Sequence, residues 1–560
     1  YIHAQNLSNP VSSGIAITRF EIEALQTYYR VAAKKLYAAD NSTPYIFNYR
    51  YSSPALNDPA HSEAASNCPE FSNSCTEYVE EYSQFRGHGL VSMTDPYGKT
   101  VETTYYQNDL LMGRPSKVEI LSGQTLLSST HFTYLSNSLP TASMTTPEGR
   151  TYVGVQRYFT YTSHEENRIY NHVGSFINST ATEYIYEMVY GNLKWVKEYA
   201  NGNLYRQTEN FYYYNPASTV NYLPGLTGKT RVYDAANKVI GITLYQYDGN
   251  TGSHEAAPVY GKLTAVRSLQ EGSNFSQISY GYDAWGNTIS QTVYSGYGTW
   301  NSNPISGAQT TTTVFDPDYH TYPISITNPL NQTTLIAYNY TRSVPTSETD
   351  PNGNTTLAWY DTLSRMTGLT LPLSGGQGSM TFDYPSTNPF KATITLRIDP
   401  LTTYTVERTY DGMGRIIQNN AGGIKTDFGY NAYGQITQQS MPYSGPSAEA
   451  YTTTSYDELG RPLSITTPGS STTYKYNGLT TTITEPDTSG SIHFTVITND
   501  VWGRVENITP PTGPEVGYSY DELGRMQAAT RGGSTTEITY DYAGRKISMN
   551  DPDMGVWTYS

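Results

Sequence analysis

In the second half of the chain, Tyr, Ile or Val recurs at every second position, with Thr, Ser or a charged residue between. Residues 535–540 (Thr-Thr-Glu-Ile-Thr-Tyr) and 472–476 (Thr-Thr-Tyr-Lys-Tyr) are examples. β-branched and aromatic residues at a period of two predict strands whose successive side chains point to opposite faces. Leu and Ile are few in these stretches. We therefore expect an all-β protein with neither sheet face strongly apolar.

One short frame, Tyr-Asp-x-x-Gly-Arg, recurs between these strands. Complete copies are Tyr410–Arg415, Tyr456–Arg461, Tyr520–Arg525 and Tyr540–Arg545, and looser copies are Tyr282–Asn287, Tyr360–Arg365, Tyr430–Gln435 and Asn499–Arg504. From 410 to 430 and from 520 to 540 the interval is 20 residues. Self-similarity at such a period indicates a repeat architecture.

The chemistry of the frame predicts a hairpin turn. The Asp side chain can accept hydrogen bonds from the backbone amides that follow it, and Gly supplies a positive φ. One repeat is then one β-hairpin with its link to the next. We expect the Tyr to stack on its equivalent in the neighbouring hairpin, and the Arg to reach a carboxylate or an aromatic face.

A catalytic role for the repeated Asp is disfavoured, because seven or eight copies of one active site are implausible whereas copies of one turn are common. A structural role is assigned to Tyr282, Asp283, Gly286, Tyr360, Asp361, Arg365, Tyr410, Asp411, Gly414, Arg415, Tyr456, Asp457, Gly460, Arg461, Gly503, Arg504, Tyr520, Asp521, Gly524, Arg525, Tyr540, Asp541, Gly544 and Arg545.

The regularity of the frame divides the chain into three regions. Residues 1–115 form a pre-repeat β region, 116–280 hold degenerate hairpins, and 281–560 hold regular repeats that stop mid-repeat. We interpret the chain as a segment of a larger protein, because it begins and ends within the pattern.

Several local predictions accompany this division. Good helix formers over 20–37 leave a helix open, but 28–51 favour a hairpin. Residues 56–80 are predicted to be a polar loop. In Tyr233–Lys238, Asn237 replaces the Gly, and Asn tolerates positive φ. Polar spacers near 300–310, 371–390 and 441–450 are predicted to be long loops.

The only two cysteines are Cys68 and Cys75, in the predicted loop. We favour a disulfide between them over a metal half-site or two free thiols, because the pair is isolated and has no companion ligands. A disulfide would imply an oxidising, exported setting.

Composition excludes some classes of function. The net charge of −15 argues against nucleic-acid binding, which needs a basic footprint. No apolar run reaches the length of a membrane span, and no signal peptide opens the chain. Tyr numbers 54 against 14 Phe, which suits amphipathic sheets better than a thick oily core.

Searches for catalytic frames find none. The sequence has no G-x-S-x-G elbow, Walker loop, H-E-x-x-H or dinucleotide fingerprint. His164 and His172, near Glu165 and Glu166, do not have the spacing of a zinc site. We therefore predict no catalytic, cofactor-binding or metal-binding residue, no cofactor, and no enzyme activity.

The recurring frame resembles the YD repeat of the RHS superfamily, which includes teneurins and the B and C components of bacterial toxin complexes. The resemblance is clear over 280–560 and weaker before it. Phe85-Arg86-Gly87-His88-Gly89 and the later Gly113-Arg114-Pro115 resemble the segment before the repeats in toxin-complex B components, with His88 where an aromatic residue is usual. We read His88 as a packed or exposed turn residue.

The resemblance implies a long antiparallel strip of hairpins that spirals into a hollow shell. Its tyrosines should form ladders from hairpin to hairpin, and separate closed sandwiches should be absent. RHS proteins that carry toxins cleave themselves with aspartates after the repeats. Asp551-Pro552-Asp553-Met554-Gly555 lacks that pattern, and Asp95-Pro96-Tyr97-Gly98 lies in the other half, so no catalytic residue is carried over.

Three functions follow from the resemblance. The first is a shell around a C-terminal toxin or effector, where the enclosed polypeptide belongs to the same protein or to a partner subunit. The second is a teneurin-like adhesion module that binds cell-surface or carbohydrate ligands. The third is a structural part of an extracellular fibre, sheath or wall-associated assembly. All three place the chain outside the cell or on its surface, without nucleic acid and without a membrane span in this segment.

Overall fold

A computed structural model of the chain describes residues 18–25, 28–37, 43–56, 85–108, 110–111, 113–138, 143–145, 151–153, 158–213, 223–249, 257–373, 378–387, 389–487 and 490–559. All regular structure within these ranges is β, in 41 strands. Cys68, Cys75 and most of the predicted loop at 56–80 lie outside the described residues, so the disulfide stays a prediction.

The strands alternate with short turns throughout the described chain. The first half contains β1 (Thr18–Leu25), β2 (Tyr28–Leu36), β3 (Tyr45–Leu56), β4 (Phe85–Thr94), β5 (Lys99–Tyr105), β6 (Pro115–Ser122), β7 (Thr125–Ser138), β8 (Ser143–Thr145), β9 (Thr151–Val153), β10 (Tyr158–Tyr170), β11 (Phe176–Tyr186), β12 (Leu193–Ala200), β13 (Asn203–Tyr212), β14 (Thr227–Asp234), β15 (Val239–Tyr247), β16 (Leu263–Glu271) and β17 (Asn274–Tyr282).

The second half contains shorter strands at closer spacing. They are β18 (Thr288–Tyr294), β19 (Ala308–Phe315), β20 (Pro323–Thr327), β21 (Thr333–Asn339), β22 (Val344–Thr349), β23 (Thr355–Tyr360), β24 (Met366–Thr370), β25 (Met380–Asp383), β26 (Lys391–Arg397), β27 (Thr403–Tyr410), β28 (Ile416–Ala421), β29 (Ile424–Tyr430), β30 (Ile436–Ser440), β31 (Tyr451–Tyr456), β32 (Pro462–Thr467), β33 (Ser470–Asn477), β34 (Thr480–Pro486), β35 (Ile492–Asn499), β36 (Val505–Thr509), β37 (Val516–Tyr520), β38 (Met526–Arg531), β39 (Ser534–Tyr540), β40 (Lys546–Asp551) and β41 (Gly555–Thr558).

These strands form one open antiparallel meander of 39 strands, with β8 and β9 as a separate two-stranded hairpin. Each strand of the meander pairs with the next one in sequence, and β7 pairs with β10 across the β8–β9 insertion. The predicted hairpin over 28–51 is confirmed, since β2 pairs with β3 and no helix forms over the described part of 20–37. The sheet continues through residues 115 and 280.

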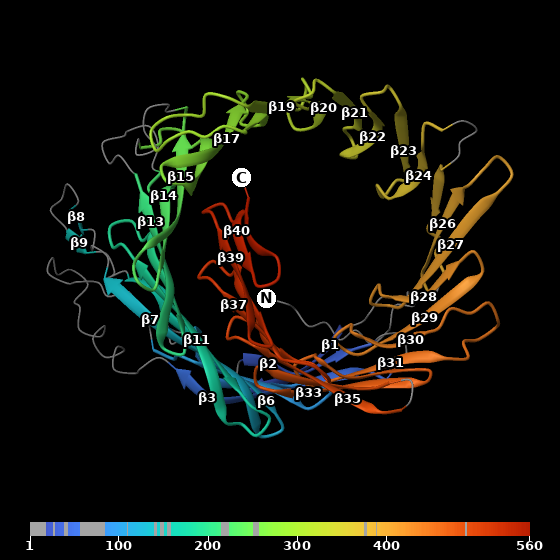
Figure 1. Ribbon diagram of the computed structural model, residues 1–560. Coiled ribbons are helices and arrows are strands. Elements are labelled where there is room, and N and C mark those ends of the chain that lie inside the picture. The colour runs from blue at the N-terminus through green and yellow to red at the C-terminus, as the bar shows by residue number, and fades with distance from the viewer. Residues whose placement is uncertain are drawn as a thin grey trace, which may run out of the picture.

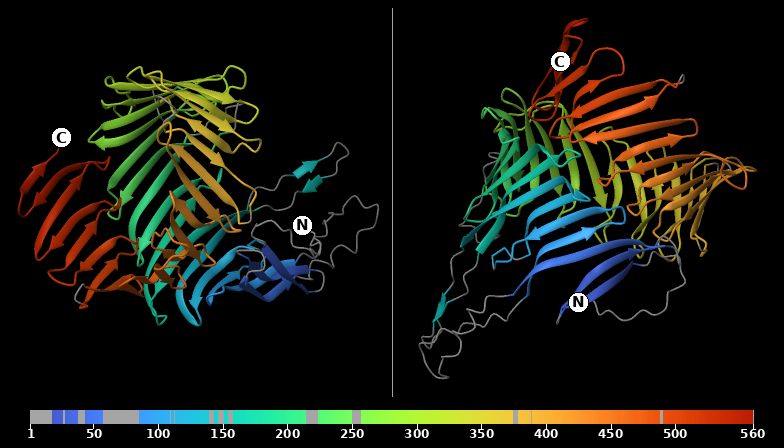
Figure 2. Two further views of the ribbon diagram at one scale, coloured as in Figure 1. Left: turned by 90° about the vertical axis from the view of Figure 1, so that its right-hand side faces the viewer. Right: turned by 90° about the horizontal axis from the view of Figure 1, so that it is seen from below.

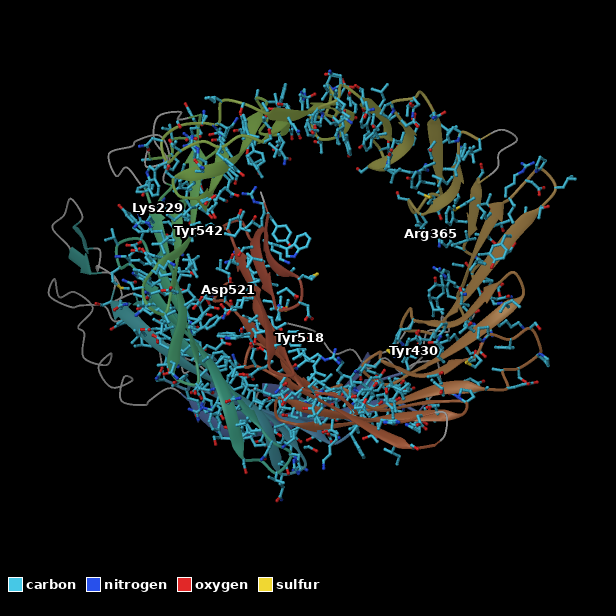
Figure 3. The ribbon with its side chains drawn as sticks, viewed as in Figure 1. Lys229, Arg365, Tyr430, Tyr518, Asp521 and Tyr542 are labelled. Atoms are coloured by element: carbon cyan, nitrogen blue, oxygen red, sulfur yellow. The ribbon has the colours of Figure 1, made fainter. Side chains whose placement is uncertain are left out.

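The strip curls into a spiral of more than one turn (Figure 1). Strands β1–β6 and β33–β35 lie at the same side of the ring, one after the other along the spiral axis (Figure 2). The side chains of the described residues leave the middle of the ring open (Figure 3). The expected strip is therefore confirmed, and no separate closed sandwich occurs in the described part.

A regular series of β-bulges accounts for the curvature. In the repeats the register shifts at the motif tyrosine, as between Ser455 and Tyr456 and between Ser519 and Tyr520. A bulge bends its strand and increases the local twist. Because these bulges all lie at the same edge of the strip, their bends add up along the chain.

The two edges of the strip differ. We call the edge that carries the turns 283–287, 361–365, 411–415, 431–435, 457–461, 500–504, 521–525 and 541–545 the YD edge. The opposite edge carries the turns between the other strand pairs, such as 95–98, 272–273 and 350–354. The division matters below because the two edges meet.

The sheet has little apolar core. Among the described residues only one buried apolar cluster forms, Leu244, Leu269 and Phe275, with Ile242 and Trp300 packed against it. Large hydrophobic side chains elsewhere on the strip are often exposed. The prediction that neither face would be strongly apolar is confirmed.

Candidate functional site: the repeated turns and the seam

Each complete motif is a hairpin turn closed by its aspartate. In 457–461 the Asp457 Oδ1 accepts hydrogen bonds from the amides of Leu459 at 3.0 Å and Arg461 at 2.8 Å. The Asp457 amide donates to the Arg461 carbonyl at 2.8 Å. At the glycines φ is 80° for Gly460, 82° for Gly524 and 83° for Gly544, so the left-handed position is confirmed.

The motif arginine connects its own turn to the next repeat. Its Nε donates to the second oxygen of the motif aspartate at 2.6–2.7 Å in the motifs that begin at Asp361, Asp411, Asp457, Asp500, Asp521 and Asp541. Its guanidinium lies over the tyrosine ring of the following hairpin, as Arg461 does over Tyr476 at 3.9 Å and Arg525 over Tyr540 at 4.9 Å. Both predicted contacts of the arginine are confirmed.

The tyrosines do not stack on one another. Within the described residues no ring pair joins consecutive motif tyrosines, so the prediction of direct stacking is wrong. The arginine of one turn lies over the ring of the next tyrosine instead, and a cation over a ring face is stabilised by the ring quadrupole. We call this series of pairs the tyrosine–arginine ladder.

The tyrosine hydroxyls connect successive hairpins through the backbone. Tyr540 donates to the Met526 carbonyl at 2.8 Å, Tyr520 to Val505 at 2.7 Å and Tyr430 to Ile416 at 2.7 Å. Each acceptor directly follows the preceding turn of the YD edge. The hydroxyl thus satisfies a strand carbonyl while the ring shields the turn.

Sequence reasoning missed part of this series in the degenerate half. Tyr134, Tyr212 and Tyr247 donate in the same way to the carbonyls of Pro115, Leu193 and Thr227 at 2.9–3.0 Å. The register also shifts at Tyr212 and Tyr247. A tyrosine at the last position of its strand is the signal that identifies Tyr212 and Tyr247, whereas Tyr134 lies inside β7 and has no such signal.

The unit at Tyr233–Lys238 resembles the frame but does not belong to the YD edge. Asn237 has φ 66°, as predicted, but the turn lies at the opposite edge, between β14 and β15. Tyr247-Asp248 occupies the equivalent place on the YD edge. Asp248 accepts from the amides of 259–262 across an inserted loop. The insertion hides the frame, because Asp and Gly are no longer at fixed spacing.

The environment of these groups shifts their pKa values. The Arg365 backbone amide is the main cause that lowers the pKa of the Asp361 carboxyl. Burial tends to raise the pKa of Asp541, but hydrogen bonds from Arg545 outweigh it and lower the pKa. Burial raises the pKa of the Tyr476 and Tyr520 hydroxyls. These shifts favour charged aspartates and neutral tyrosines, which suits hydrogen bonding rather than proton transfer.

The looser copies keep part of the network. In 283–287, Asn287 replaces the arginine and its side-chain amide donates to Asp283 at 2.9 Å. In 361–365, Ser364 takes the place of the glycine with φ 62°. In 500–504 the preceding residue is Asn499, and Tyr205, from the earlier turn of the spiral, contacts Arg504.

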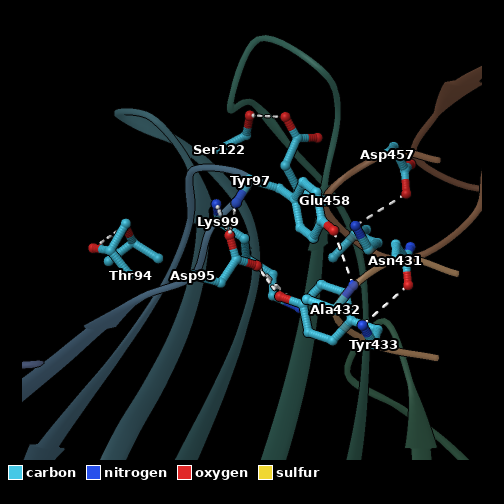
Figure 4. Close-up of polar contacts among 12 residues, drawn as sticks. Thr94, Asp95, Tyr97, Lys99, Ser122, Asn431, Ala432, Tyr433, Asp457 and Glu458 are labelled. Atoms are coloured by element: carbon cyan, nitrogen blue, oxygen red, sulfur yellow. Dashed lines mark hydrogen bonds and ion pairs between the residues drawn. The ribbon is translucent and has the colours of Figure 1, made fainter. Parts of the chain in front are cut away.

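Successive turns of the spiral meet along a seam, which we define as the contact of YD-edge turns from 430 to 545 with opposite-edge residues from 45 to 297. At one end of it the Ala432 amide donates to the Tyr97 hydroxyl at 2.9 Å, and the Tyr433 hydroxyl donates to the buried Asp95 carboxylate (Figure 4). Asp95-Pro96-Tyr97-Gly98 is therefore a docking turn.

Farther along the seam, Tyr205 is the centre of the contact. Its hydroxyl donates to the Asp521 carbonyl at 2.7 Å and accepts from Arg504 at 3.1 Å. Its ring lies 5.0 Å from that of Trp502, centroid to centroid. The seam thus uses the turn residues themselves as well as the backbone.

The seam continues at two further places, one between the Tyr97 and Tyr205 contacts and one after the Tyr205 contact. His172 contacts the Asn477 side chain at 3.1 Å, and a Cβ added at Gly478 would lie 2.2 Å from Ile177. The Tyr542 amide donates to the Gln270 carbonyl at 3.0 Å, beside a cavity of about 320 Å³. A side chain at Gly478 would have to displace the end of the Ile177 side chain.

The remaining candidates have structural positions. His88 is buried in strand β4 beside the Tyr51 ring, so it is packed, but it is not in a turn as one reading supposed. In the described part of the chain no group of three or more His, Cys, Asp or Glu residues could hold a metal ion. Nor is any described helix long and apolar enough to cross a membrane.

Two solved structures have a similar architecture, although no match is found at the level of sequence. No family model and no curated protein matches the sequence. The structure is similar to the crystal structure of TcdB2-TccC3, with a TM-score of 0.66 and 13% identity over 94% of this chain. It is also similar to that of TcdB2-TccC3-Cdc42, with a TM-score of 0.67 and 11% identity over 94% of this chain.

The chain spans 37% and 39% of the length of those two chains. At this identity the likeness concerns the fold, and the fold is a spiral shell built from hairpin repeats. The likeness and the recurring Tyr-Asp-x-x-Gly-Arg turn together show that the chain has the fold of these structures, a spiral strip of antiparallel hairpins.

Proposed function

We propose that this chain is a non-enzymatic part of the wall of a shell, and that the shell encloses the effector polypeptide of a secreted or cell-surface protein. The observation that carries the proposal is the seam. Residues more than 200 positions apart in sequence, such as Gln270 and Tyr542, contact each other, so successive turns of the spiral are joined along this line.

The character of the wall supports the proposal. A wall around an unfolded polypeptide must hold its shape without a core that fills the interior. Here the strand rows are tied by turn hydrogen bonds and by the tyrosine–arginine ladder, and the interior stays open (Figure 3). An enclosed chain could therefore occupy the space without displacing side chains of the wall.

The repeated aspartates and arginines support a non-enzymatic role. They form hydrogen bonds within their own turns and contact neighbouring hairpins, so these side chains have structural roles. The similarity to TcdB2-TccC3 supports a shell, and extension to an enclosed effector is our inference from the interior and the seam.

Proteolysis of the natural protein that carries this chain tests the proposal. We expect the enclosed polypeptide to resist proteinase K while the seam is intact. Gly478→Leu should open the seam, because a side chain there collides with Ile177. The enclosed polypeptide should then be cut several times faster.

Gly423→Leu is the matched control. Gly423 also has a positive φ, of 90°, but no atom lies within 4 Å of an added Cβ. It reproduces the backbone strain without the collision, so protection should persist. Rapid digestion of the polypeptide in the natural protein, no slower than in Gly478→Leu, would contradict enclosure.

A further inference from the structure

The two faces of the strip can be assigned from one place on the seam. Thr230, Thr243 and Ser268 line the cavity beside Tyr542 and Ala543. Strands β39 and β40 flank this YD turn and lie inside the ring at β13–β17 (Figure 1). The side chains that line the cavity therefore point toward the interior, and we call the face of the sheet that carries them the inner face.

The strand register extends this assignment along the chain. Residues paired directly across two antiparallel strands have their side chains on the same face, and the face alternates along each strand. Followed from Ser268 through β17–β31, the register keeps Thr313, Ile394 and Thr454 on the inner face. Over β32–β39 it adds an aliphatic row, which we call the inner lane: Ile465, Ile483, Ile497, Ile508, Val516 and Ile538.

The inner lane is apolar and accessible. All six side chains are half-buried. Thr454 and Thr472 lie on either side of Ile465 in the neighbouring strands, so the lane is a row on a mixed face and not a core. A half-buried isoleucine on the inner side of the wall gains from further burial by an occupant of the interior.

The outer face of the same strands is chemically different. There hydroxyls hydrogen-bond one another across neighbouring strands at 2.6–3.0 Å, in the pairs Ser455–Ser464, Thr466–Ser471, Thr530–Thr535 and Thr539–Ser548. Phe494, which is 55% exposed, is an exception on this face. The aliphatic side chains of these strands are thus directed mainly to the interior.

The inner face of the degenerate half is polar. Asn210, Thr230, Thr243, Ser268 and Ser276 pair directly, one after the other, across β13–β17. Within this row Thr230 Oγ1 donates to Asn210 Oδ1 at 3.0 Å. The interior therefore has an aliphatic row and a row of hydroxyls and amides, on different parts of the wall.

We propose that the enclosed polypeptide is held on the inner lane in an extended, non-native form, by its apolar side chains. The inference rests on the proposed function and adds the surface that makes the contact. A folded domain has buried most of its large apolar side chains, whereas an unfolded polypeptide exposes them. The threonines beside the lane also suit an extended polypeptide, because their hydroxyls can bond its backbone groups.

Site-specific photo-crosslinking in the natural protein that carries this chain tests the inference. The photo-crosslinker p-benzoylphenylalanine is placed at Ile465 in one variant and at Ile538 in a second, so that the test survives if one variant fails to assemble. On irradiation both positions should crosslink to the enclosed polypeptide. Mass spectrometry should locate the crosslinks in its apolar segments.

Ser464 and Thr208 are the matched control positions. Ser464 is adjacent to Ile465 and half-buried like it, but its side chain lies on the outer face. Thr208 is half-buried on the inner face, next to the polar row. The crosslink yield to the enclosed polypeptide should be several-fold lower at Thr208 than at Ile465, and lowest at Ser464.

Protease protection of the enclosed polypeptide, measured on the same samples, separates two kinds of failure. A protected polypeptide that crosslinks equally from Thr208 and Ile465 would overturn the lane and leave enclosure standing. Crosslinks from Ile465 and Ile538 that reach only strands of the wall would do the same. An unprotected polypeptide in the unaltered protein would overturn enclosure itself, and the lane with it.

Discussion

Two regions of the strip are stabilised in different ways. In β14–β17, Leu244, Leu269 and Phe275 form a buried cluster, and the β18–β19 loop brings Trp300 over it. In β27–β40 no such cluster occurs among the described residues. There the complete motifs tie their turns to the next hairpin by aspartate, arginine and tyrosine, as in Asp521, Arg525 and Tyr540.

The region β14–β17, which the β18–β19 loop covers, also buries a cation. We call it the covered region. Arg267 is 2% exposed, and burial lowers its pKa. It donates to the Gln277 side chain at 2.8 Å and to the Trp300 carbonyl at 3.1 Å. Hydrogen bonds to neutral groups keep it in place, and the loop supplies some of them. The loop is therefore part of the core rather than a flexible spacer.

The difference shows what the complete motif provides. In β14–β17 the Tyr247-Asp248 turn has a long loop and ends in Lys262 instead of an arginine. The Lys262 ammonium donates to the Asp283 carbonyl at 3.3 Å and lies 5.9 Å from the centroid of the Tyr282 ring, a looser link to the next hairpin. Apolar packing adds to this link there. Where the motif is complete, the arginine provides the link, and apolar packing is dispensable. The motif thus substitutes for a core.

The largest expected effect is on the core of the covered region. Phe275→Ala should lower the free energy of unfolding of β14–β17 by about 3–5 kcal/mol, the usual cost of deleting a buried phenyl ring. Urea unfolding followed by tryptophan fluorescence measures the change. The control Val556→Ala, at an exposed position, should cost little. A cost for Phe275→Ala as small as the control's would remove the distinction between the regions.

The next effect concerns the turn glycine of the regular repeats. Gly524→Val should cost roughly 1–3 kcal/mol, because a β-branched residue is strained at positive φ. An added Cβ would lie 3.6 Å from Arg504, so space is not the obstacle. Gly517→Val, in β37 of the same hairpin, lacks the positive φ and should cost less. Thermal unfolding of the two variants separates strain from volume, and equal costs would refute the turn model.

Much of the regular half could be predicted from the sequence, because its determinants are local. The Asp-x-x-Gly spacing fixes the turn at 457–461 and the alternation fixes the strands beside it. The arginine contacts also follow, since the side chain is long enough to reach both a carboxylate and a ring. Direct tyrosine stacking does not occur, because the arginine of the preceding turn covers a face of the ring.

The degenerate half and the seam depend on contacts between residues distant in sequence, so less of their structure could be predicted from the sequence. Tyr233-Asp234 and Tyr247-Asp248 look alike as dipeptides, and only strand order reveals which lies on the YD edge. The meeting of Tyr205 with Trp502 depends on the curvature accumulated over many bulges. The total curvature of the strip cannot be predicted from motif spacing or from composition.

A smaller effect tests the link between hairpins. Tyr540→Phe removes the hydroxyl that donates to Met526 but keeps the ring over which Arg525 lies. We expect a loss of about 0.5–1.5 kcal/mol, typical of one hydrogen bond. Arg525→Met should cost more, because it also leaves the Asp521 carboxylate without its ion pair. Urea unfolding of both variants gives the order, and a reversed order would mean that the arginine link is unimportant.

The last effect depends on pH and concerns a turn that lacks the arginine altogether. Asp316 is fully buried, and its oxygens accept from the amides of Tyr319, Thr321 and Tyr322 at 2.5–2.9 Å. Burial tends to raise its pKa, but the amides of 319–322 outweigh this and lower the pKa from 3.8 to about 2. Because the folded-state pKa is below the unfolded one, the carboxylate stabilises the fold fully above pH 4 and loses that contribution as the pH falls toward 2. Asp316→Asn should therefore lower the melting temperature at pH 6, and the difference from the unaltered chain should shrink between pH 4 and pH 2. Asp318→Asn, exposed in the same loop, should show no such trend. A difference for Asp316→Asn that stays constant down to pH 2 would show that shape, and not charge, holds this turn.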